Sequence, residues 1–78
     1  MVFIRLLSNG GNTARYSYQP ENDGKEGVLA YDFTKNEGVI EELAEKDGES
    51  GFYRSQVYKT IREAGISNLP SEKTLMWY

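Results

Sequence analysis

One segment of this 78-residue chain spaces its apolar side chains as a helix requires more clearly than any other, and this limits the possible folds more than any other feature. The segment is residues 52–64, and its apolar stripe consists of Tyr53, Val57, Ile61 and Ala64. Ser50 can cap the first turn, and Gly65 stands where a glycine commonly ends a helix. A single helix can cover only one face of a sheet, so the other face must be polar or must contact a partner.

The residue pattern in the rest of the chain predicts mainly β-strands separated by turns. The segments with strand character are residues 2–7, 13–19, 28–33 and 74–78. Clusters of glycine, asparagine and aspartate separate the first three of them, which favours antiparallel hairpins. In the second strand, alternation places Tyr16 and Tyr18 on one face and Arg15 on the other.

Residues 34–46 fit two different elements. As a helix, this stretch would have Asn36 as a cap and four apolar residues on one face, Val39, Ile40, Leu43 and Ala44. As a hairpin, it would turn at residues 35–38 and continue as a fourth strand over residues 39–44. Gly38 is unfavourable in the first turns of a helix but suits a turn that needs positive φ, so we favour the strand.

Together these segments predict a single α+β domain over residues 1–78. Its elements follow one another as β-β-β-β-α-β, and an antiparallel sheet of four to five strands carries one main helix packed on one face. No stretch approaches the ~18 apolar residues that a membrane span needs, and the apolar N-terminus is too short for a signal peptide. We therefore expect a cytoplasmic protein without membrane contact.

Composition excludes most kinds of catalytic centre. The chain contains neither cysteine nor histidine, so it lacks disulfides, thiolate nucleophiles and the usual nitrogen ligands for zinc. Acidic side chains crowd residues 41–49, but so small a domain seldom builds the cleft that a catalytic carboxylate pair needs, and we interpret them as a solvated edge. We expect no enzyme activity, no cofactor and no metal site. The net charge of −3 also argues against nucleic acid as the partner.

The uncovered sheet face is the expected functional surface. It combines basic side chains with surplus aromatic residues, a mixture typical of modest protein–protein interfaces. Most of the tyrosines, and Trp77, are expected in the core or at its rim, and the remainder at a contact surface. The interface candidates are Arg5, Arg15, Tyr16, Tyr18, Asp32, Trp77 and Tyr78. We therefore expect a non-enzymatic interaction module that binds a protein partner and self-associates, as a homodimer in the simplest case.

Two alternatives stay open at this face. Tyr16 and Tyr18 alternate with Arg15, so the sheet could instead stack and neutralise a single-stranded nucleic acid. Asp32 either begins a turn, the interpretation that we favour, or pairs with Arg5 or Arg15 at a partner contact. The acidic total charge makes protein binding the preferred interpretation of the face.

Several short motifs occur in an order that resembles a group of small Gram-positive bacterial proteins of unknown function. The motifs are Tyr-x-Tyr-x-Pro-Glu (Tyr16, Tyr18, Pro20, Glu21), Tyr-Asp (Tyr31, Asp32), Leu-Ala-Glu-x-Asp (Leu43, Ala44, Glu45, Asp47), a tyrosine-bearing helix and a terminal Trp-Tyr (Trp77, Tyr78). The resemblance covers most of the chain and favours the strand for residues 39–44. It implies no activity and assigns no residue a role.

Overall fold

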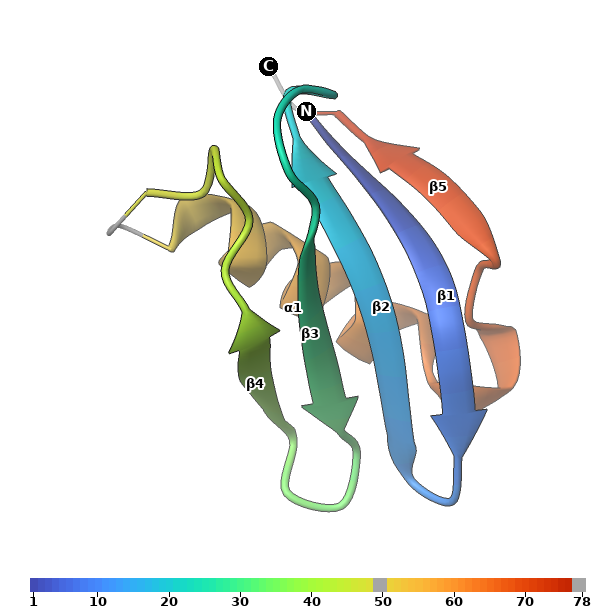
Figure 1. Cartoon of the computed structure of the whole chain (residues 1–78). Helices are drawn as coiled ribbons and strands as arrows, with labels where there is room; N and C mark the ends of the chain where they lie inside the picture. Colours follow the sequence, from blue (N-terminus) through green and yellow to red (C-terminus); the bar gives the residue numbers. More distant parts are fainter. Residues whose placement is uncertain (49–50, 77–78) are drawn as a thin grey trace.

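The computed structural model describes residues 1–48 and 51–76, which form one sheet and one long helix (Figure 1). The strands are β1 (Val2–Gly10), β2 (Thr13–Pro20), β3 (Gly27–Asp32), β4 (Glu37–Glu42) and β5 (Glu72–Leu75). The helix is α1 (Phe52–Ala64), and a short 3₁₀ helix, η1 (Ile66–Asn68), follows it. The predicted α+β class and the element order β-β-β-β-α-β are confirmed.

All neighbouring strands pair antiparallel, in the order β4-β3-β2-β1-β5. The first four strands form a meander, and α1 then crosses one face of the sheet before β5 returns beside β1 (Figure 1). β5 begins at Glu72, earlier than predicted, because its pairing with β1 starts opposite Arg5. β4 and β5 are therefore the two edge strands, at opposite sides of the sheet.

The segment that fitted either a helix or a strand is the strand β4, which confirms the preferred interpretation. The role expected for Gly38 is wrong, however, because the residue with positive φ in this hairpin is Asn36, at 53°. Gly38 lies within β4 against the ring of Tyr58 from α1, and a Cβ atom there would overlap that ring. The glycine therefore permits a close approach of α1 to β4 rather than a turn.

The limits of α1 match the prediction, but its N-terminal cap does not. Gly51 occupies the N-cap position in a left-handed conformation, with φ of 69°, and the predicted cap Ser50 lies outside the described residues. At the other end, Gly65 has φ of 78° and donates its N–H to the carbonyl of Ile61 at 3.1 Å, as expected of a glycine that ends a helix. Among the described residues, no helix is long and apolar enough to cross a membrane.

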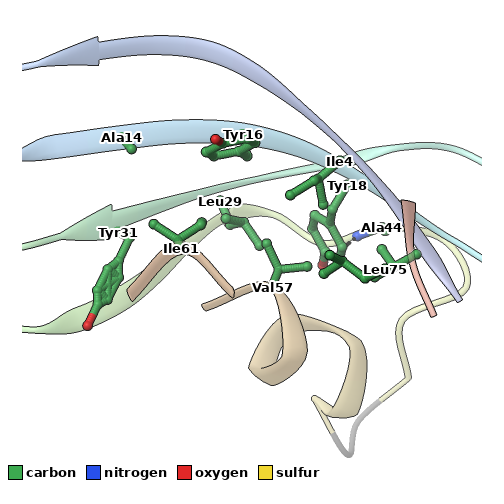
Figure 2. Packing of buried hydrophobic residues seen from close by; sticks show 11 residues of the cluster. Ile4, Ala14, Tyr16, Tyr18, Leu29, Tyr31, Ala44, Val57, Ile61 and Leu75 are labelled. Carbon is green, nitrogen blue, oxygen red and sulfur yellow. Dashed lines mark hydrogen bonds between the residues drawn. The ribbon is translucent and has the colours of Figure 1, made fainter. Parts of the chain in front are cut away.

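The hydrophobic core lies between α1 and the sheet, and the sheet supplies most of it (Figure 2). Its buried residues are Val2, Ile4, Ala14, Tyr16, Tyr18, Leu29, Tyr31, Ala44, Val57, Ile61 and Leu75. The helix contributes only Val57 and Ile61 as buried side chains, because Tyr53 and Ala64 of the predicted stripe are partly exposed. A narrow helix surface thus meets a broad sheet surface.

Two tyrosines fill much of that sheet surface and keep their hydroxyl groups hydrogen-bonded. The hydroxyl of Tyr16 donates to the carbonyl of Pro70 at 2.6 Å. The hydroxyl of Tyr18 donates to the carboxylate of Asp47 at 2.7 Å. Burial raises the pKa of each hydroxyl to about 12. The core therefore depends on both phenols remaining neutral.

We expect Ile61→Ala to lower the free energy of unfolding by roughly 2–5 kcal/mol, because it deletes fully buried atoms and leaves a cavity under α1. Urea denaturation followed by circular dichroism measures the change. Glu63→Ala, at an exposed position of the same helix, is the control and should stay within about 0.5 kcal/mol of the wild type. Similar midpoints for the two variants would show that Ile61 is not part of the core.

The tyrosine pKa values predict a loss of stability in alkaline solution. In the unfolded chain, Tyr16 and Tyr18 ionise near pH 10.0, whereas in the folded protein they ionise near pH 12. Their contribution to stability is thus complete below the lower pH and is lost as the pH rises through the higher one. Thermal melts across this range should show a falling midpoint, with a shallower fall for Tyr16→Phe. A constant midpoint would contradict the assignment.

Candidate functional site

Ion pairs connect the strands across the sheet face opposite α1. Arg15 of β2 forms two hydrogen bonds with the carboxylate of Glu41 in β4, at 2.9 and 3.0 Å, and these lower the pKa of that carboxyl. Arg5 of β1 pairs with Glu72 of β5 at 3.2 Å, and its guanidinium lies 5.6 Å from the ring centre of Phe3. The open face therefore combines charged side chains that are paired within the chain with apolar residues such as Phe3 and Val39.

Two of the predicted interface residues, Tyr16 and Tyr18, do not lie on this face. Both point toward α1, and neither has any exposed surface (Figure 2). The expectation that they form a contact or stacking surface has to be corrected, because the alternation that groups them with Ala14 directs all three into the core. Trp77 and Tyr78 lie outside the described residues.

Asp32 begins the turn between β3 and β4, which confirms the favoured interpretation of this residue. Its Oδ1 atom accepts the backbone N–H of Thr34 at 2.8 Å and that of Lys35 at 3.2 Å. The alternative pairing with Arg5 or Arg15 is wrong, because both arginines bind glutamates instead. Asp32 therefore shapes the hairpin that leads into β4.

The most exposed strand of the sheet is β4. All six of its residues are exposed, and among the described residues its only neighbour in the sheet is β3. Val39 is 50% exposed on the open face, and Ile40 is 39% exposed on the face toward α1. Apolar side chains thus lie along an unpaired backbone edge, which is a ready template for another strand.

A β-bulge concentrates negative charge on one face of β4. Val28 pairs with Glu42 and Leu29 pairs with Ile40, so the intervening Glu41 has no partner in the ladder. As a result, both glutamates lie on the open face, where each binds a basic side chain. Within the acidic segment, Glu41, Glu42 and Glu45 are exposed, as predicted of a solvated edge. Asp47 is buried instead, and Glu49 lies outside the described residues.

The other edge of the sheet is protected differently. β5 has only four residues, and its exposed positions carry the polar side chains of Glu72, Lys73 and Thr74. Short, charged edge strands resist the addition of further strands. Of the two edge strands described, β4 is the one that combines length, exposure and apolar side chains.

A groove of about 400 Å³ lies between α1 and the hairpin that leads into β4. Gly38 of β4 lines it together with the rings of Tyr31 and Tyr58, whose centres are 6.4 Å apart. The helix adds Lys59 and Arg62, which are neighbours on the helix surface because they are three residues apart. Burial raises the pKa of the Tyr58 hydroxyl, so this group stays neutral. The groove is thus aromatic at its base and basic along the helix.

A buried polar cluster ties the segment after β4 to the first turn of α1. The Oδ2 atom of Asp47 accepts the hydroxyl of Tyr18 at 2.7 Å and lies 3.3 Å from a guanidinium nitrogen of Arg54. The Tyr18 hydroxyl oxygen in turn accepts the N–H of Ala44 at 3.1 Å. The second carboxylate oxygen of Asp47 is buried without a hydrogen-bond partner among the described residues. The cluster holds β4 and α1 in a fixed relation and so maintains the groove between them.

The described residues contain no cluster of three or more acidic side chains that could hold a metal ion. The buried carboxylate of Asp47 is bound to Tyr18 and Arg54 and does not line the groove. The edge of β4 and the groove beside it are therefore the candidate site.

Comparisons with known proteins do not identify a family. No protein-family model matches the chain, and no curated protein or solved structure is significantly similar to it. The resemblance to small Gram-positive bacterial proteins therefore stays a prediction. Function has to be inferred from β4 and the adjoining groove.

We expect Tyr18→Phe to lower the free energy of unfolding by roughly 1–3 kcal/mol, because it removes a donor to buried Asp47 and an acceptor for the N–H of Ala44. Urea denaturation measures the loss. Tyr53→Phe is a matched control, since the Tyr53 hydroxyl donates to the exposed carboxylate of Glu21, and its effect should stay within about 0.5 kcal/mol. Equal losses in both variants would contradict a special role for the buried cluster.

Proposed function

We propose that this protein is a non-enzymatic interaction module that binds an extended segment of a partner protein along the free edge of β4. The exposure of β4 carries the proposal: all six residues are accessible, and the outer backbone edge has no neighbouring strand among the described residues. Extended peptides commonly bind by adding a strand to such an edge, with affinity from main-chain hydrogen bonds and specificity from alternate side chains.

β4 offers apolar contacts on both sides of an added strand. Val39 lies on the open face, and Ile40 lies on the face toward α1. Leu43, directly after the strand, is 50% exposed. An added strand would remove apolar surface of these side chains from water, and this burial favours association.

The acidic character of β4 favours a partner of different sequence over a second copy of the chain. Glu37, Glu41 and Glu42 are half of the strand. Pairing two β4 strands would bring the glutamates of both chains together, and like charges on neighbouring strands are destabilising. The homodimer predicted from the sequence is therefore the less favoured use of the same edge.

A single-stranded nucleic acid is the weaker proposal. Its motivation was an accessible strand on which Tyr16 and Tyr18 alternate with Arg15. Both tyrosines are buried, and Arg15 binds Glu41 in the same chain. A stacking platform for bases needs exposed aromatic rings, and β2 does not offer them.

Selection from a displayed library of short random peptides tests strand addition at β4. We expect enriched peptides with alternating apolar residues, and their binding should shift the amide resonances of β4 more than those of β5. Val39→Lys should weaken binding about tenfold or more, because it places a charge in an apolar contact. Thr74→Lys adds the same charge to β5 and should leave binding unchanged.

Absence of any enriched peptide, or equal losses in the two variants, would contradict the proposal. Sedimentation velocity at micromolar concentration tests whether a second copy of the chain binds to β4 in place of another protein. A dimer that Val39→Lys dissociates and Thr74→Lys does not would assign the edge to self-association instead. A monomer that binds selected peptides supports the proposal as stated.

A further inference from the structure

We propose that the partner segment carries a carboxylate, which lies in the groove beside β4 and is bound by Lys59 and Arg62. The inference rests on the proposed function, because it assigns the chemistry of a strand added to β4. It follows from where the groove opens, from the unpaired charge within it, and from the different charge on the two faces of β4.

The groove opens where one face of an added strand would point. Gly38 of β4 lines it, and so does Tyr31, the residue opposite Gly38 in β3. Both positions face α1, since Tyr31 is buried under the helix (Figure 2). Residues opposite each other in paired strands lie on the same face, so the added strand would direct a side chain toward the groove at this level.

The basic residues of the groove are not neutralised by the chain itself. Arg5, Arg15 and Arg54 each bind a carboxylate. Arg62 is therefore the only one of the four arginines without an ion pair among the described residues. Lys59 also has no ion pair within the described ranges, and both side chains are exposed. Their charges thus face the groove without a counter-ion.

Neutral groups in the groove favour an anion as well. The Oδ1 atom of Asn36 accepts the hydroxyl of Tyr31 at 3.4 Å, which leaves the amide nitrogen of Asn36 as a donor. A guanidinium binds a carboxylate through two parallel hydrogen bonds, and Arg62 supplies that group. The groove therefore suits a carboxylate better than a cation or an apolar side chain.

The two faces of the added strand would meet opposite charges. On the open face, the strand would lie beside Glu37 of β4, which has no ion pair among the described residues, so a further acidic side chain is disfavoured there. On the face toward α1, it would meet Lys59 and Arg62. An acidic residue is thus expected at one position of the face toward α1 and not at the positions directly before and after it. General attraction to basic protein would not produce this alternation.

The peptides selected for binding to β4 test the inference. Their aligned sequences should show Asp or Glu at one such position. A synthetic peptide with that consensus should bind Arg62→Glu roughly five- to tenfold more weakly than the wild type, and replacing its acidic residue by the amide should remove the difference. Lys73→Glu makes the same change in net charge on β5 and should leave the affinity unchanged.

The source of the carboxylate is distinguished with peptides that have a free or an amidated C-terminus. Loss of binding on amidation would assign the groove to a terminal carboxylate, and equal binding would assign it to a side chain. Peptides that bind β4 without an acidic preference, and with equal affinity for Arg62→Glu, would overturn the inference and leave strand addition in place. Absence of any peptide that binds β4 would overturn both proposals.

Discussion

The packing of a single helix against one face of the sheet is the constraint on which the rest of the molecule depends. α1 supplies only Val57 and Ile61 as buried side chains, so the sheet has to fill the remaining volume. It does so with Tyr16, Tyr18 and Tyr31, which are large enough to reach the helix and its flanks. Because a buried hydroxyl needs a partner, these rings extend to polar groups at the margin of the core. The polar cluster at the start of α1 and the lining of the groove both result from this arrangement.

Local patterns in the sequence were sufficient for the elements of the fold. The helical spacing around Val57 and Ile61 and the period-two alternation in β2 depend only on neighbours along the chain, and both appear where they were predicted. Alternation shows which residues share a face, but not which face is covered. Tyrosine suits a core and an interface equally well, so the sequence left Tyr16 and Tyr18 as interface candidates although they form the core. The expected role of Gly38 was wrong for a similar reason, because glycine is required there by a contact with Tyr58, twenty residues away in the sequence.

The candidate site depends on information that the sequence does not display locally. An edge strand is defined by the order of strands in the sheet, and nothing within residues 37–42 distinguishes an edge from a central position except the excess of glutamate. The groove arises because α1 approaches the start of β4 but leaves Ile40 exposed. The sequence shows Arg62 only as a basic residue near the end of the predicted helix, and its lack of a carboxylate partner appears only when the other arginines are placed.

The unequal edges of the sheet also decide how many chains can join it. β4 presents six exposed residues, whereas β5 is short and polar. Growth of a sheet at both sides would permit head-to-tail polymers, as in fibres built from repeated strand addition. If a strand binds to β4 as proposed, the short and polar β5 disfavours a second addition at the opposite edge. The expected stoichiometry is one partner segment per molecule. In the protein without a bound segment, the bulge in β4 opposes aggregation, because it turns two glutamates toward solvent.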